Sequence, residues 1–106
     1  MEQKRLKKLE ARARILKAMA HASRLMIIEE LARKACNVGE LTEKIGADTS
    51  TVSKHLTLLK STGIIQDAKR GQNVYYTLRC PCVLNFYACV EGVIQKNLSA
   101  QMELTS

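Results

Sequence analysis

The sequence predicts a mainly α-helical domain with one small β-hairpin, and two patterns lead to this expectation. Apolar residues recur at three- and four-residue spacing over most of the 106 residues, which is the pattern of amphipathic helices. Between residues 64 and 78 the pattern changes to alternation, with β-branched and aromatic residues on both sides of a Gly-containing turn. We therefore expect a single domain over residues 1–98, followed by a frayed tail over residues 99–106.

The composition favours a cytoplasmic protein with a polyanionic partner. Lys and Arg number 17 against 10 acidic residues, so the formal net charge is +7. No apolar run is long enough to span a bilayer and the start of the chain lacks the apolar core of a signal peptide, so we expect no membrane partner. In a reducing compartment, four cysteines indicate metal binding, thiol chemistry or core packing rather than disulfides.

Three helices are expected before residue 46. The first runs from about Gln3 to Ala20, with an apolar stripe beside many basic residues. The segment 21–24 interrupts the pattern, and a second helix follows it and ends at about residues 36–37. We expect His21 to cap a helix or to make an internal hydrogen bond rather than to bind a ligand. The third helix covers Val38 to Ile45 and stops at a glycine.

A fourth helix is expected over residues 49–61, with Asp48 as N-cap and Gly63 just beyond its end. Its apolar residues fall on one stripe, and its other face carries short hydroxyls and a cation. Such side chains suit close approach to phosphates and base edges in a major groove. The turn before this helix is only three residues long and contains a glycine, so the third and fourth helices form a helix-turn-helix.

The expected hairpin at residues 64–78 is the wing of a winged helix-turn-helix, with Lys69 and Arg70 at its turn, where they could reach DNA phosphates. A last helix is expected over residues 82–98, with Pro81 as its first position. This helix is too apolar for the surface of so small a domain. We therefore expect the helices at both termini to form a homodimer interface.

Several segments resemble the ArsR/SmtB family of winged-helix repressors. They are Val38 to Leu41, Ser50 to Leu56 with Leu59 and Gly63, Arg70-Gly71 with Val74 to Tyr76, and Leu16 to His21 with Arg24-Leu25. The resemblance implies a homodimer that binds an inverted-repeat operator in double-stranded DNA, needs no cofactor to do so, and leaves it when an effector binds. The DNA-facing residues expected from the pattern and the resemblance are Thr49, Ser50, Thr51, Ser53, Lys54, His55, Lys69 and Arg70. His55 has an alternative role, a hydrogen bond within the domain.

The cysteines differ from the metal site of many family members, because Asn37-Val38-Gly39 stands where those members have Cys-Val-Cys. The candidate ligands here are Cys80, Cys82 and Cys89, with Cys36 as a secondary candidate. All-sulfur ligands favour a thiophilic ion such as arsenite or antimonite, with zinc as an alternative.

One helix cannot bring Cys82 and Cys89 onto one ion, since they lie about 10 Å apart along its axis. Core packing of the thiols, redox or persulfide sensing, and a small thiol oxidoreductase remain open alternatives.

Overall fold

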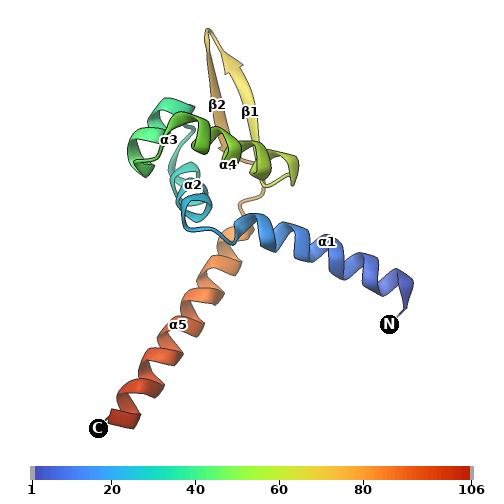
Figure 1. Cartoon of the computed structure of the whole chain (residues 1–106), viewed down its shortest axis with the longest axis vertical. Helices are drawn as coiled ribbons and strands as arrows, with labels where there is room; N and C mark the ends of the chain where they lie inside the picture. The colour runs from blue at the N-terminus through green and yellow to red at the C-terminus, as the bar shows by residue number, and fades with distance from the viewer. Residues whose placement is uncertain (1, 106) are drawn as a thin grey trace.

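The computed structural model describes residues 2–105 and confirms the mainly α-helical fold with one hairpin (Figure 1). The structure places the third and fourth helices where the sequence predicts them. The elements in chain order are α1 (Gln3–Met19), α2 (Ala22–Arg33), α3 (Val38–Ile45), α4 (Thr49–Ser61), β1 (Ile65–Arg70), β2 (Asn73–Leu78) and α5 (Val83–Thr105).

The hydrophobic core lies between α2, α3, α4 and the base of the hairpin. Each helix contributes the apolar stripe that its sequence spacing predicts, and α4 buries Val52, Leu56 and Leu59 almost completely. The residues that fill the rest of this core are Ala18, Met19, Ile27, Ile28, Leu31, Cys36, Leu41, Ile64 and Ile65.

The hairpin pairs β1 with β2 in antiparallel register, from Ile65 opposite Leu78 to Arg70 opposite Asn73. Its turn contains Gly71, whose φ of 62° lies in the left-handed region that favours glycine. Lys69 and Arg70 therefore belong to β1 rather than to the turn, which corrects the sequence-based boundary. The paired strands continue two residues further because the two-residue turn is enough to reverse the chain.

The two terminal helices project from this core in different directions (Figure 1). The radius of gyration is 16.8 Å, whereas a compact domain of this length has about 13 Å. No residue of α5 is buried, and it exposes large apolar side chains, among them Phe86, Val93 and Leu98. A helix with this much exposed apolar surface requires a partner surface.

The start and end of the last helix differ from the expectation. The amides of Val83 and Leu84 donate to the carbonyls three residues earlier, so Pro81 and Cys82 form a turn and the helix begins at Val83. The helix also continues to Thr105 instead of fraying from residue 99. Residues 99–105 contain no Gly or Pro and are mostly good helix formers, so nothing stops it. Ser106 lies outside the described residues.

The boundary between α1 and α2 is also tighter than expected. Helix α2 begins at Ala22, because the His21 Nδ1 accepts a hydrogen bond from the Ser23 amide at 3.1 Å and caps the helix. The expected capping role of His21 is therefore confirmed.

The apolar stretches of the described helices are all too short or too polar to cross a membrane.

Candidate nucleic-acid interface

Helices α3 and α4 form the expected helix-turn-helix, with both sides of the turn fixed locally. Gly46 ends α3 with a φ of 77°. Asp48 then caps α4, because its carboxylate accepts from the Thr51 amide at 2.7 Å and from the Ser50 hydroxyl at 2.9 Å. These hydrogen bonds hold the pKa of Asp48 below its usual value. The cap orients the first turn of α4, which carries the candidate DNA-facing residues.

The exposed side of α4 is polar except for Leu58 near its C-terminal end. Ser53 and Lys54 lie on the surface, on the side away from the buried stripe, and the Thr57 hydroxyl donates to the Ser53 carbonyl at 2.9 Å. In the described chain, no hydrogen bond engages the hydroxyls of Thr49 or Ser53, whereas the Thr51 side chain bonds to the Asp48 carboxylate. The hydroxyls of Thr49 and Ser53 are therefore available to a ligand on this face. The exposed candidate residues of α4 are Thr49, Ser50, Thr51, Ser53 and Lys54.

His55 differs from the other candidates because it is half-buried and bonded within the domain. Arg24 donates from its Nη1 to the His55 Nδ1 at 3.2 Å, and the His21 ring lies 4.5 Å from the His55 ring. The same guanidinium donates from its Nε to the Ala18 carbonyl at 2.6 Å. Burial, His21 and Arg24 together lower the pKa of His55. The alternative role of His55 is therefore the one the structure shows, and its proposed DNA contact stays a prediction.

We call Arg24, His21 and His55 the Arg24 cluster, since Arg24 bonds both to the end of α1 and to α4. The sequence analysis did not identify Arg24 as a functional residue. Arg24 lies in the segment that was expected only to separate two helices. Its partners Ala18 and His55 are 6 and 31 residues away in the sequence. Helical spacing does not detect contacts of this kind.

The wing places its two candidate cations on an exposed strand. The Arg70 guanidinium lies over the Tyr75 ring, 5.4 Å from its centroid. The Lys60 Nζ on α4 pairs with the Asp67 carboxylate at 2.9 Å, and this ion pair connects α4 to β1. An open groove of about 480 Å³ lies between the start of α3, Ser53 of α4 and the wing. Its lining residues are Asn37, Val38, Gly39, Ser53, Gln72, Asn73, Val74 and Tyr76.

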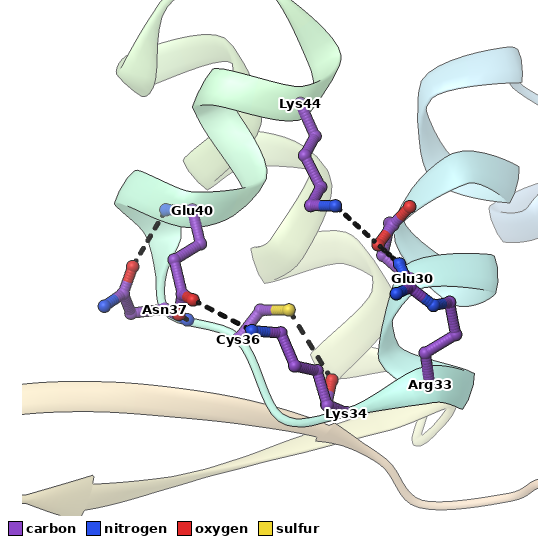
Figure 2. A network of polar contacts seen from close by, with 7 residues as sticks. All are labelled: Glu30, Arg33, Lys34, Cys36, Asn37, Glu40 and Lys44. Atoms are coloured by element: carbon purple, nitrogen blue, oxygen red, sulfur yellow. Dashed lines mark hydrogen bonds and ion pairs between the residues drawn. The ribbon is translucent and has the colours of Figure 1, made fainter.

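The start of α3 beside this groove is held by a polar network (Figure 2). Asn37 and Glu40 form a capping box, in which each side chain accepts from the backbone amide of the other. The Lys34 Nζ lies 3.5 Å from Glu40, and the Lys44 Nζ lies 3.3 Å from Glu30. The network fixes α3 against α2, and hence fixes the base on which α4 is mounted.

The cysteines occupy two different environments. Cys36 is fully buried, and its backbone pairs with that of Tyr76. Its thiol donates to the Lys34 carbonyl at 3.5 Å (Figure 2). Burial raises the pKa of this thiol. Cys82 and Cys89 are exposed, and the half-buried Cys80 donates its thiol to the Gly63 carbonyl at 3.6 Å. Among the described residues of one chain, no three side chains of His, Cys, Asp or Glu are grouped closely enough to hold a metal ion.

An apolar groove of about 470 Å³ lies where α1, α2 and α5 meet. Phe86, Val90 and Ile94 of α5 are each 43–46% exposed along it. The Tyr87 hydroxyl donates to Glu29 of α2 at 2.9 Å and fixes the start of α5. The remaining lining residues are Leu16, Met19, Ala20, Leu25 and Glu91.

Comparisons with known proteins agree with this architecture. A family described as bacterial regulatory protein, arsR family, matches residues 21–67. The transcriptional repressor PagR of Bacillus anthracis is 35% identical over 88 residues, which cover 82% of this chain and 81% of PagR. NolR from Sinorhizobium fredii is similar in structure, with a TM-score of 0.81 and 26% identity over 88% of this chain and 93% of NolR.

A second similar structure is the homodimeric winged helix-turn-helix DNA-binding domain of Mb0332 from Mycobacterium bovis. Its TM-score is 0.79, and its 28% sequence identity covers 94% of this chain and 93% of that domain. The resemblance inferred from the sequence is thereby confirmed. This chain belongs to the arsR family of bacterial regulatory proteins.

Proposed function

We propose that the protein is a homodimeric transcriptional repressor that binds an inverted-repeat operator through α4 and the wing. The observation that carries this proposal is the exposed face of α4, where Ser53 and Lys54 stand opposite a fully buried stripe and beside an exposed basic strand. Short polar side chains on a helix that projects from a rigid core suit major-groove contacts. Binding to DNA also implies that the protein acts in the cytoplasm.

The dimer is supported by the apolar surface of the terminal helices. The groove between α1, α2 and α5 is open, and α5 exposes apolar side chains along most of its length. The similar domain of Mb0332 is described as homodimeric. Two recognition helices related by a two-fold axis would enter successive major grooves about 34 Å apart.

The DNA-binding proposal is tested by titrating the protein into a labelled duplex from the region upstream of its own gene. We expect tight binding that weakens steeply with salt, because phosphate contacts release counterions. Ser53→Ala should reduce the preference for the operator over scrambled duplex. The control Ser99→Ala changes the same residue type on α5, outside the proposed DNA interface, and should leave this preference unchanged. Binding that is insensitive to salt would refute the proposal.

For the effector, we propose a thiophilic metalloid, arsenite or antimonite, bound by Cys80, Cys82 and a third thiolate. The cysteines of one chain do not form this set, so the proposal requires the third thiolate to come from a second copy. Cys89 is the better donor, because it is exposed whereas Cys36 is fully buried with a raised pKa. Three thiolates suit a soft trigonal ion better than zinc, which usually takes four ligands.

Thiol oxidation or persulfide formation at Cys80, Cys82 or Cys89 is a second candidate for the signal. The observation that favours it is the exposure of Cys82 and Cys89, since accessible thiols react and buried ones do not. HlyU from Vibrio cholerae, which is 30% identical, has a solved structure described as reduced. A thiol oxidoreductase has less support, because among the described residues these thiols form no cluster with an acid or a histidine.

The effector is tested by repeating the DNA titration anaerobically with arsenite, zinc or a persulfide donor. Arsenite should weaken binding by about 5- to 150-fold, the usual range of such coupling. Cys82→Ser should remove this response and leave DNA binding intact, whereas the neighbouring-site control Ala88→Ser should keep it. Release by the persulfide donor alone would replace the metalloid by a redox signal.

A further inference from the structure

Helix α1 carries nearly all of the net charge of the protein. It contains seven Lys and Arg residues against one Glu, a net charge of +6, while the whole chain has +7. The remaining residues hold ten cations against nine acids and are therefore almost neutral. The proposed recognition helix and wing hold four cations against one acid, a net charge of +3, so the largest positive charge of the chain lies on α1. The cations of α1 are Lys4, Arg5, Lys7, Lys8, Arg12, Arg14 and Lys17.

These seven cations are exposed and are not neutralised within the described part of the chain. None of them forms an ion pair there, and the only hydrogen bond that engages one runs from Arg14 Nη2 to the Ser61 carbonyl at 3.4 Å. Four of the ten cations elsewhere are paired with acids: Arg33 and Lys44 with Glu30, Lys34 with Glu40, and Lys60 with Asp67. The charge of α1 is therefore available to an external polyanion.

Three of these cations share one face of the helix. At 3.6 residues per turn, Lys4, Lys8 and Arg12 lie on the face of α1 that carries Ile15 and Met19. That face packs onto the core at its C-terminal end, through the buried Met19 and the half-buried Ile15. Beyond the core the same face continues as a row of cations. The apolar residues that could contact a second copy lie on a separate face: Leu6, Leu9, Ala13 and Leu16.

Helix α1 leaves the core beside the C-terminal end of α4, as the contact of Arg14 with Ser61 shows (Figure 1). It extends for about 25 Å at 1.5 Å per residue. Its cationic face therefore continues outward from the recognition helix over a length that spans several phosphates of a duplex.

From this charge and placement we propose that Lys4, Lys8 and Arg12 of α1 form a second DNA-contacting surface, which binds phosphates of the duplex that α4 reads. The contact carries no sequence information, because backbone phosphates are the same in every sequence. This inference rests on the proposed DNA-binding function. It separates affinity, supplied mainly by α1, from sequence preference, supplied by α4 and the wing.

The test compares two triple variants of the full chain on a labelled random-sequence duplex over a range of salt concentrations. Lys4→Gln/Lys8→Gln/Arg12→Gln removes the row and keeps good helix formers. The control Lys7→Gln/Lys17→Gln/Lys96→Gln removes the same charge from exposed positions on the other side of α1 and on α5. Each lost phosphate contact should lower the slope of log Kobs against log salt by about 0.9. The proposed homodimer carries this row twice, six cations in all, so we expect a slope shallower by about 5 for the α1 variant and an unchanged slope for the control.

On the operator duplex, the α1 variant should lose affinity by the same factor as on random sequence, so the ratio of the two affinities should not change. Equal slopes for the α1 variant and the wild type would overturn the inference and leave the proposed function intact. So would a lower sedimenting mass for the α1 variant, which would assign the row to a subunit contact. A wild-type protein that binds neither duplex would overturn both.

Discussion

The Arg24 cluster should couple the end of α1 energetically to the recognition helix. Replacing Arg24 by Ala removes the hydrogen bonds to the Ala18 carbonyl at 2.6 Å and to His55 at 3.2 Å. Hydrogen bonds to charged groups contribute about 1.5–3 kcal/mol each, and less where solvent reaches them. Since Arg24 is half-exposed, we expect Arg24→Ala to lower the free energy of unfolding by about 2–3 kcal/mol.

A double-mutant cycle isolates the contact between α2 and α4. Arg24→Ala and His55→Ala should show a coupling energy of about 1 kcal/mol, because each variant removes one end of the same hydrogen bond. The assay is urea unfolding followed by circular dichroism at one fixed protomer concentration, since dimerisation changes apparent stability. The control cycle pairs His55→Ala with Arg14→Ala, whose contact is with Ser61, and should be additive. Additivity in the Arg24 cycle as well would refute the proposed coupling.

Three further predictions follow from individual contacts. Because the pKa of His55 is lowered in the folded state, the unfolded chain binds more protons below the usual pKa of about 6.5. The contribution of His55 to the free energy of unfolding should therefore be fully present above that pH, and it should be lost as the pH falls towards the lowered pKa of the folded state. Urea unfolding at several pH values should show a smaller loss for His55→Gln than for the wild type. Gly63→Ala forces a φ of 83° on alanine and should lower the free energy of unfolding by about 1 kcal/mol. Gly92→Ala, in the open middle of α5, should raise it by about 0.5–1 kcal/mol. Thermal unfolding of the two variants and the wild type measures both effects. In native protein, iodoacetamide should label Cys82 and Cys89 quickly and Cys36 only on unfolding, and rapid labelling of Cys36 would contradict its place in the core.

The sequence was sufficient for the elements whose boundaries depend on local signals. Asp48 and Gly46 are capping residues, and the structure starts α4 and ends α3 where those residues predict. The expected end of α5 near residue 98 was wrong, because residues 99–105 carry no Gly or Pro to stop the helix. Helix propensity alone extends that helix once its start is fixed.

The candidate site was predictable only where a residue acts from its own helix face. Ser53 and Lys54 could be assigned to the exposed side of α4 from spacing alone. His55 lies close to that side in sequence, yet a guanidinium from α2 turns it inward, and no local pattern contains that information. The metal-site candidates failed to meet within one chain for a similar reason, since distances between a turn and a helix depend on the fold or on a second copy.

The junction around Gly63 gives the cysteines a physical connection to DNA recognition. Gly63 follows the last turn of α4, and its carbonyl accepts from the Arg79 Nη1 at 3.1 Å and from the Cys80 thiol at 3.6 Å. The Arg79 amide also donates to the Ile64 carbonyl at 2.9 Å. A modified or ligated Cys80 sulfur can no longer donate a hydrogen to Gly63, so any thiol chemistry there acts directly on the end of the recognition helix. This connection does not depend on the identity of the effector, because a metalloid and a persulfide both remove the same S–H donor.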